Sequence, residues 1–327
     1  MSRAVEEAER LVAGGRLADA VHLLDEAVKA GDGLAAFELG HWRLTGALIR
    51  RDLALARDHF LKAAELGVGD AQPVSIALLA NGAGNSGRHW ARALELLRAA
   101  GASDASARKQ LDLLGAMSLD ADGNPREEAN GTPLCPDPPV LRFANFLSSA
   151  ECAYLIEKAA PLLEPAAVLH PQTGQLIRDP IRSSTSAAFP FVAEDPVLHA
   201  INRRIARATA TSYEQGEPLQ VLSYEPGQQY KLHSDALAGD PNQRVVTFLV
   251  YLNNDYSGGE TAFPDLDLTI RGQSGEGLLF GNVDATGAPH PRARHAGLPV
   301  TQGRKMLLSK WIRGKPLDLS GPPGRPF

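Results

Sequence analysis

Three Ala-rich segments recur in the first 115 residues and give this part of the chain a regular period. The segments are AVHLLDEAVKAGDGLA (20–35), ARDHFLKAAELGVGDA (56–71) and ALELLRAAGASDA (93–105). A period of about 35 residues is typical of stacked helical hairpins, in which each unit packs on its neighbours. The sequence therefore predicts a helical array, almost free of strands, over residues 4–115.

Small residues occupy equivalent positions in these segments. They are Ala20, Ala56 and Ala93, and then Gly31, Gly67 and Gly101. Alanine side chains let paired helices approach closely, and glycine readily takes the left-handed conformation that ends a helix. We expect paired helices to approach closely at the three alanines, and each glycine to take this conformation at the end of a helix.

Residues 35–71 resemble one complete SEL1-like repeat, a relative of the tetratricopeptide repeat. The matching letters are AAFELGHWRLTG and, after a short connection, DLALARDHFLKAAELGVGDA. The resemblance implies a repeat domain over residues 1–118, with degenerate outer copies acting as caps. Such arrays typically bind proteins or peptides, so the domain would either recruit a substrate or support the second half of the chain or a dimer.

A segment rich in Pro, Gly, Asn and Asp follows the repeats. It covers residues 119–139 and reads LDADGNPREEANGTPLCPDPP. Its closely spaced prolines exclude a helix and favour an extended chain. We interpret it as a linker between the repeat domain and a second domain at residues 140–327.

From residue 140 the pattern changes to two helices followed by short strands. The helices are expected at 148–163, after serine caps, and at 195–210, where Pro196 takes a favoured first-turn position. Strands are expected at 219–226, 244–253, 267–272, 277–282 and 304–314. Short strands with Gly and Pro turns favour a β-sandwich or jelly roll. The fold class is therefore α+β.

The overall composition excludes several classes of protein. Hydrophobic residues make up 44% of the chain and the formal net charge is −5, which gives no reason to expect nucleic acid or an anionic membrane as partner. No apolar run reaches the length of about 18 residues that spans a membrane, and the N-terminus lacks a signal-peptide core. Only Cys135 and Cys152 are present, which fits a reducing, cytoplasmic location.

His233 and Asp235 lie two residues apart, shortly before the apolar run RVVTFLVYLN (244–253). On an extended strand both side chains point to one face, where they can bind one divalent metal ion. His295, in RARHAGLPV, is a candidate third ligand. Two imidazoles and a carboxylate on one side of an octahedral iron leave positions open for oxygen and a co-substrate. The His-x-Asp pair alone is equally consistent with a polar turn.

Four segments of the second half resemble, in this order, the catalytic domain of prolyl 4-hydroxylase-type Fe(II)/2-oxoglutarate-dependent dioxygenases. They are SYEPGQQYKLHSD, RVVTFLVYLNNDYSGGETAFP, EGLLFGN and RHAGLPVTQGRKMLLSKWIRG, within residues 180–314. The resemblance implies a double-stranded β-helix (jelly-roll) core with flanking helices. It also implies Fe(II), 2-oxoglutarate as co-substrate and O₂, with L-ascorbate as a further expected reductant.

The family motif assigns the catalytic metal ligands to His233, Asp235 and His295. It assigns the basic residue that holds the distal carboxylate of 2-oxoglutarate to Lys305, and it matches Tyr224 and Thr261 to the co-substrate pocket. Strand periodicity favours Lys305 over Arg304, because its side of the strand is the less charged one. That side carries Lys305, Leu307, Ser309 and Trp311.

Four further residues match the substrate side of the family's site. Tyr230 and Trp311 are expected to line the pocket, and Arg182 and Arg244 to lie near the substrate groove. Other interpretations stay open at this point. Aromatic residues on strands are often plain core, and arginines are often solvated.

The resemblance implies hydroxylation coupled to oxidative decarboxylation of 2-oxoglutarate to succinate and CO₂. In related halogenases a small residue replaces the carboxylate, so Asp235 favours hydroxylation. The substrate is expected to be a peptide or protein side chain, recruited by the repeats. The alternatives are a small molecule such as a free amino acid, or a non-enzymatic binding protein with a relic barrel. The intact set of ligands and Lys305 speaks against the last.

Overall fold

The computed structural model of the chain describes residues 2–83, 87–169, 176–178, 181–237 and 239–319. The chain divides into two compact units. The helical unit comprises Met1–Arg126, Pro190–Ile201 and Asp318–Phe327, and the sheet unit comprises Glu127–Phe189 and Asn202–Leu317.

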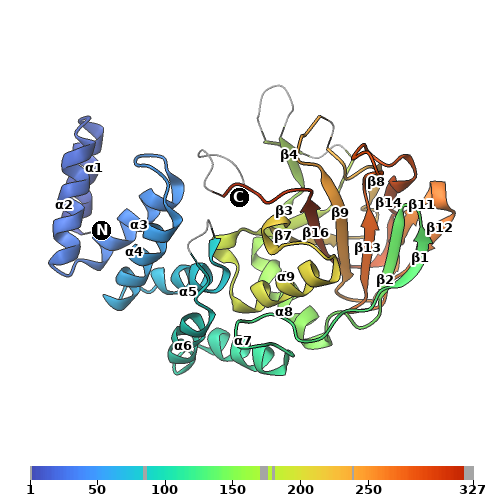
Figure 1. Ribbon diagram of the computed structural model, residues 1–327, viewed down its shortest axis with the longest axis horizontal. Helices are drawn as coiled ribbons and strands as arrows, with labels where there is room; N and C mark the ends of the chain where they lie inside the picture. The colour runs from blue at the N-terminus through green and yellow to red at the C-terminus, as the bar shows by residue number, and fades with distance from the viewer. Residues whose placement is uncertain (1, 84–86, 170–175, 179–180, 238, 320–327) are drawn as a thin grey trace. The chain divides into compact units, whose positions relative to one another are not determined.

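Helices make up most of the helical unit, as the Ala-rich period predicts. Figure 1 shows α1 and α2 as an antiparallel hairpin, and each later helix packs on the one before it. The helices are α1 (Arg3–Ala13), α2 (Leu17–Lys29), α3 (Gly33–Thr45), α4 (Leu53–Glu65), α5 (Ala71–Asn81), α6 (Trp90–Gly101) and α7 (Ala105–Ala116).

The equivalent alanines of the three segments are all fully buried, which is consistent with close packing of the helices. Gly31 and Gly67 follow α2 and α4 with φ of +91° and +88°, so both take the left-handed conformation. The prediction for Gly101 was wrong, because it is the last residue of α6 and its φ is not positive. A Cβ at Gly101 would lie 3.2 Å from Leu111 Cδ1, so close packing against α7 accounts for this glycine.

The segment Pro190–Ile201 belongs to the helical unit although it lies within residues 140–327, which we interpreted as one domain. Phe191 joins the apolar cluster formed around Phe60 and Leu78. Its carbonyl accepts a hydrogen bond of 2.7 Å from Asn81 Nδ2, a buried amide at the end of α5. Contacts between residues so distant in sequence leave no local pattern.

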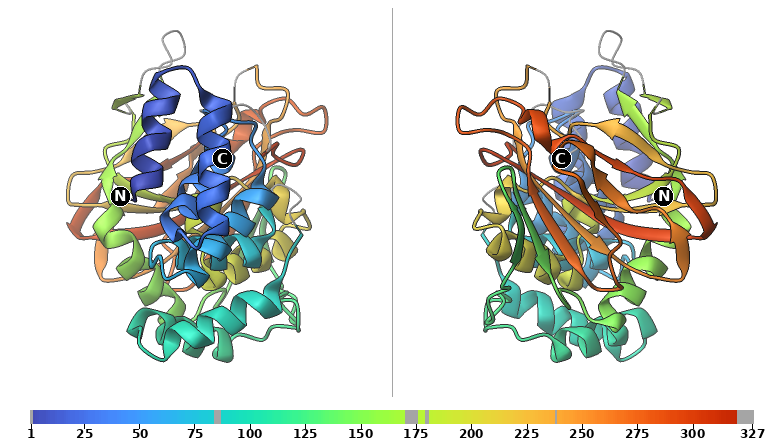
Figure 2. Two further views of the ribbon diagram at one scale, coloured as in Figure 1. Left: turned by 90° about the vertical axis from the view of Figure 1, so that its left-hand side faces the viewer. Right: turned by 90° about the vertical axis from the view of Figure 1, so that its right-hand side faces the viewer.

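The sheet unit is built around one antiparallel sheet of eight strands, the major sheet, ordered β1-β2-β13-β9-β16-β7-β6-β3. The hairpin of β1 and β2 forms one end of it and is green in Figure 2. Its strands are β1 (Thr132–Pro136), β2 (Pro139–Phe143), β3 (Glu164–Pro165), β6 (Thr185–Phe189), β7 (Leu219–Tyr224), β9 (Arg244–Tyr251), β13 (Gly277–Gly281) and β16 (Lys305–Arg313).

A second, four-stranded sheet is ordered β12-β11-β14-β8, and two small two-stranded sheets pair β10 with β15 and β4 with β5. These strands are β4 (Ala167–Leu169), β5 (Leu176–Arg178), β8 (Tyr230–His233), β10 (Tyr256–Gly258), β11 (Thr261–Phe263), β12 (Leu268–Ile270), β14 (His295–Gly297) and β15 (Val300–Gly303). Together the sheets form the expected jelly-roll core. The five strands predicted from sequence all exist, as β7, β9, β12, β13 and β16, whereas the sequence predicted none of the other strands.

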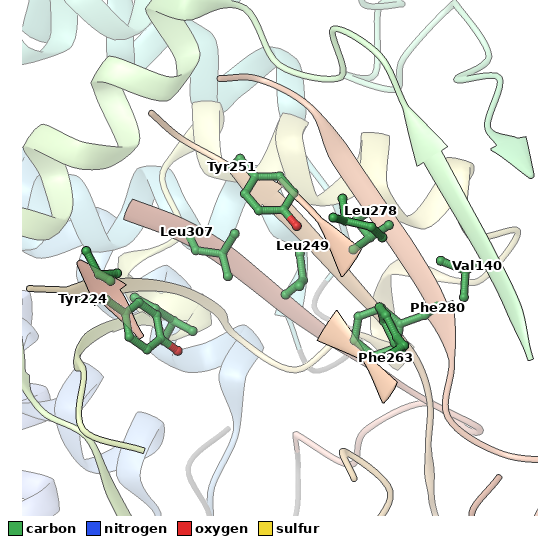
Figure 3. Close-up of a cluster of buried hydrophobic side chains, with 11 residues drawn as sticks. Val140, Tyr224, Leu249, Tyr251, Phe263, Leu278, Phe280 and Leu307 are labelled. Carbon is green, nitrogen blue, oxygen red and sulfur yellow. The ribbon is translucent and has the colours of Figure 1, made fainter. Parts of the chain in front are cut away.

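The apolar core of the sheet unit lies between the two sheets. Figure 3 shows side chains of the major sheet, such as Leu278 and Leu307, gathered with Phe263 of β11. The rings of Phe263 and Phe280 meet edge to face with centroids 5.1 Å apart. This contact joins β11 to β13 and closes the sandwich at the level of the His-x-Asp pair.

Two helices flank the strands, as predicted. Helix α8 (Ser149–Ala159) begins with a capping box, because Ser148 and Glu151 each bond the other's backbone N–H. Helix α9 (Pro196–Ala208) carries Arg204, whose guanidinium forms an ion pair of 2.7 Å with Glu151. In the Pro-rich segment interpreted as a linker, residues 132–136 form the edge strand β1, whereas residues 120–124 form a turn in which the Asp120 N–H bonds the Asn124 carbonyl at 2.9 Å.

We predict that Asn81→Ala destabilises the helical unit. The change leaves the buried Phe191 carbonyl and Ala83 N–H without their partner. An unsatisfied buried group costs about 1–3 kcal/mol, so the free energy of unfolding should fall by that amount. Denaturant unfolding followed by circular dichroism measures it, with the exposed Ser103→Ala as control. Equal stability of the two variants would contradict the grouping of Pro190–Ile201 with the helices.

Candidate metal and co-substrate site

The pairing of β8 with β14 brings two histidines together from distant parts of the chain. The register sets His233 directly opposite His295, and their ring centroids are 4.3 Å apart. Asp235 lies two residues after the end of β8, beyond Ser234. The candidate ligand atoms of the three residues all lie within 4.8 Å of one another, and all three side chains are buried. The structure thus assembles the trio that the sequence suggested.

Backbone carbonyls fix the orientation of both imidazoles. His233 Nδ1 lies 2.7 Å from the carbonyl of Lys231, and His295 Nδ1 lies 3.2 Å from that of Ala293. A carbonyl only accepts hydrogen bonds, so each Nδ1 carries the proton. In the neutral ring the lone pair is then on Nε2, the atom that faces Asp235. The Nε2–carboxylate distances are 3.4 Å for His233 and 3.7 Å for His295.

The protonation states of His295 and Asp235 suit a divalent cation. Burial lowers the pKa of His295 to about 4, although the Asp235 carboxylate opposes the shift, so this imidazole is neutral near pH 7. Burial alone raises the pKa of Asp235, but His295, His233 and Thr247 together outweigh it and lower the pKa. A neutral imidazole and an ionised carboxylate are the forms that bind metals.

The residues therefore fit a divalent metal. His233 Nε2 is buried and makes no hydrogen bond within the part of the chain that the structure describes. A buried polar atom normally has a partner, and a metal ion would supply one. Two imidazole nitrogens and one carboxylate oxygen form the donor set of non-haem iron oxygenases.

One pocket of the sheet unit contains the trio. Eight of the ten residues expected at the site line it: His233, Asp235, His295, Lys305, Tyr224, Thr261, Tyr230 and Trp311. The rest of the lining is mainly apolar and consists of Leu222, Leu249, Gly297, Leu307 and Ser309. Arg182 and Arg244 are not part of this lining.

Lys305 places a buried positive charge in the pocket. Its Nζ donates a hydrogen bond of 2.6 Å to the carbonyl of Gly259 and lies 5.6 and 5.5 Å from the ring centroids of Tyr224 and Tyr251. Within the described residues it has no carboxylate partner within 4.0 Å. Burial lowers its pKa to about 8, opposed by the charge of Glu260. A buried ammonium without a counter-charge is suited to an anionic ligand.

Strand periodicity places this lysine correctly. Lys305, Leu307, Ser309 and Trp311 all line the pocket, as their shared side of β16 predicts. The neighbouring Arg304 points to solvent, where it pairs with Glu225 at 2.6 Å. The two basic residues therefore lie in opposite environments, and only Lys305 can reach a ligand in the pocket.

Two pocket contacts involve residues that the sequence analysis missed. Tyr251 donates a hydrogen bond of 2.8 Å to Thr261 Oγ1, and Thr247 donates one of 2.6 Å to Asp235 Oδ2. Thr247, Leu249 and Tyr251 share one side of β9. Two polar residues on the same side of an otherwise apolar strand were a readable signal that this side faces the pocket.

Each of the two aromatic residues expected on the substrate side contacts one of the two expected arginines. Tyr230 stacks on His233, with ring centroids 3.5 Å apart and an interplanar angle of 16°, and the Arg182 guanidinium carbon lies 5.3 Å from the centroid of the Tyr230 ring. The Arg244 guanidinium carbon lies 4.0 Å from the centroid of the Trp311 ring. Both arginines thus back an aromatic side chain of the pocket wall.

Arg244 is held by an acid that the sequence analysis did not identify. Its Nε and Nη2 each bond one oxygen of Glu217 at 2.7 Å. Arg313 bonds the same carboxylate, which is buried. The buried Glu217 carboxylate therefore compensates the positive charge of Arg244 within the protein.

Comparison with known proteins agrees with this geometry. A family model described as the 2OG-Fe(II) oxygenase superfamily matches residues 219–313. Prolyl 4-hydroxylase 1 of Arabidopsis thaliana is 36% identical over 197 residues, which cover 54% of this chain and 70% of that protein. The chain belongs to the 2OG-Fe(II) oxygenase superfamily. It is therefore a dioxygenase that uses Fe(II), 2-oxoglutarate and O₂.

Other similar proteins come from different sources. Prolyl 4-hydroxylase subunit alpha-1 of Rattus norvegicus is 32% identical over 194 residues, covering 57% of this chain and 36% of that protein. The solved viral collagen prolyl hydroxylase of Paramecium Bursaria Chlorella virus-1, in complex with 2-oxoglutarate, is 30% identical with a TM-score of 0.44. It covers 54% of this chain and 96% of that structure. Among the described residues of the oxygenase, no helix is long and apolar enough to span a membrane.

We predict that His233→Ala and Asp235→Ala each remove most of the metal from the oxygenase. Each change deletes one of the three converging donors while the jelly-roll core stays intact. Metal content after dialysis against Fe(II) under anaerobic conditions measures the effect, with His22→Ala, an exposed histidine of the helical unit, as control. Full occupancy in both variants would contradict the assignment of the ligands.

We also predict that Lys305→Ala weakens 2-oxoglutarate binding at least about tenfold, because a lost charged hydrogen bond costs roughly 1.5–3 kcal/mol. Anaerobic titration of the metal-loaded oxygenase measures it, and Arg304→Ala is the matched control. In the wild type, affinity should fall as the pH rises through about 8, because deprotonation removes the positive charge. A silent Lys305→Ala with a damaging Arg304→Ala would reverse the assignment.

Proposed function

We propose that this oxygenase hydroxylates a proline residue in a peptide or protein and converts 2-oxoglutarate to succinate and CO₂. The observation that carries the proposal is the continuity of one pocket, which is lined by the His-Asp-His trio, a buried ammonium and the aromatic side chains of Tyr230 and Trp311. The names of the similar proteins, prolyl 4-hydroxylases of plant and animal origin, support the choice of proline.

The metal end of the pocket is assigned to His233, Asp235 and His295, which would hold Fe(II). When bound, the metal supplies the activation of oxygen, and the protein supplies position and a restricted environment. The carbonyl contacts at both Nδ1 atoms support this role, since they aim both Nε2 lone pairs at one region.

The other end is assigned to 2-oxoglutarate. Lys305 would pair with the distal carboxylate, while Tyr224 of the major sheet and Thr261 of the second sheet line the same pocket. Register supports this grouping, because Lys305 stands directly opposite Tyr224 in the β16–β7 pair. The leucines of the lining keep this region apolar, which strengthens the pairing of the two charges.

The substrate side is assigned to Tyr230 and Trp311. A proline ring is compact and apolar, and flat aromatic faces provide contact area without demanding hydrogen bonds. Arg182 and Arg244 would act from behind these rings by cation–π contact. On this assignment the arginines hold the wall of the substrate site and do not bind 2-oxoglutarate.

We propose that the helical unit recruits the peptide or protein substrate, on the basis of its resemblance to SEL1-like repeats. We propose the cytoplasm as location, because Cys135 and Cys152 are both free thiols. Burial raises the pKa of Cys152 to about 11, so this thiol is protonated near neutral pH.

The proposal is tested by incubating the full chain with Fe(II), 2-oxoglutarate, ascorbate and a library of proline-containing peptides. Mass spectrometry should detect peptides that gain one oxygen atom, with stoichiometric succinate. Matched peptides with alanine in place of proline, and the Asp235→Ala enzyme, should yield no such product. Hydroxylation of a free amino acid with no turnover of any peptide would instead establish the small-molecule alternative.

A further inference from the structure

A second buried polar contact lies behind the Asp235 carboxylate. Asn282 Nδ2 donates a hydrogen bond of 2.9 Å to Thr247 Oγ1, and Thr247 in turn donates to Asp235 Oδ2 at 2.6 Å. Thr247 and Asn282 are each only 1% exposed. The three side chains therefore form a short relay that is shielded from water.

The chemistry of the carboxylate sets the direction of this relay. An ionised Asp235 only accepts hydrogen bonds, so the single hydroxyl proton of Thr247 points to Oδ2. The Thr247 oxygen can then only accept from its other neighbour, which requires the NH₂ group of Asn282 rather than its carbonyl. The negative charge of Asp235, acting through Thr247, therefore determines which way the Asn282 amide group points.

The backbone of Asn282 is also connected to His295, the second histidine of the trio. It follows β13 directly, and its carbonyl accepts a hydrogen bond of 2.9 Å from His290 N. That bond closes the hairpin leading into the short helix at Pro291–Ala293, whose Ala293 carbonyl orients His295. One residue is therefore connected to Asp235 through its side chain and to His295 through its backbone.

We propose that Asn282 is a positioning residue of the metal site, which acts through Thr247 to engage Oδ2 of Asp235 and to leave Oδ1 for the metal. The inference rests on the metal site of the proposed function and adds to it a residue outside the pocket lining. Hydrogen-bond partners of metal ligands typically contribute about 10- to 100-fold in metal affinity.

The test uses Co(II) as the probe, titrated into the full chain and followed by its visible absorption and by calorimetry. Asn282→Ala and Thr247→Val should each weaken Co(II) affinity about tenfold or more, and Thr247→Ser should retain wild-type affinity. Because Asn282 acts through Thr247, the double variant should bind no more weakly than Thr247→Val alone. A purely structural effect of Asn282 would not produce this non-additivity.

Two controls keep the outcome unambiguous. Asn282→Leu preserves side-chain volume, so it replaces Asn282→Ala if the smaller side chain prevents folding, and it should lose affinity equally. Asn81→Ala removes a buried amide of the helical unit and should leave Co(II) affinity unchanged.

Wild-type affinity in Asn282→Ala or Asn282→Leu, or additive losses in the double variant, would overturn the relay. Retention of Co(II) by His233→Ala would instead show that the trio itself is not the metal site.

Discussion

The antiparallel register between β8 and β14 is the constraint on which the candidate site depends. It sets His233 opposite His295, although 61 residues separate them in the chain. A shift of one residue would turn every side chain of a strand to the other face. The edge-to-face contact of Phe263 with Phe280 and the 4.5 Å approach of Phe280 to the His295 ring stabilise this arrangement. The hydrophobic core and the metal site are therefore built from the same contacts.

Two buried groups of opposite charge line the pocket. Asp235 is ionised beside the histidines, and the Lys305 ammonium donates a hydrogen bond to the Gly259 carbonyl. Burial of a charge without a counter-charge is unfavourable, so a ligand of opposite sign would stabilise each group. A divalent cation would suit Asp235, and a carboxylate would suit Lys305. On this account one apolar-lined pocket can hold a metal ion and a dicarboxylate together.

The sequence was most informative where the signal is local. Alternation along β16 placed Lys305 in the pocket and Arg304 outside it, and the period of the Ala-rich segments predicted the helical array. Contacts between residues that are distant in the chain could not be predicted from the sequence. Nothing near Gly101 reveals the approach of Leu111, and nothing near Phe191 reveals that Asn81 bonds its carbonyl. The Asn282–Thr247 contact spans 35 residues for the same reason.

We infer that the trio is held ready for the metal, because backbone carbonyls orient both histidines and because His295 is neutral and Asp235 ionised before the metal binds. The most direct measurement is the number of protons released when Co(II) binds near pH 7, obtained by calorimetry in buffers of different ionisation enthalpy. Because burial keeps His295 neutral and its neighbours keep Asp235 ionised, release from these two groups should be close to zero. Release of one or more protons from them would show that the site must first deprotonate, which would contradict the claim.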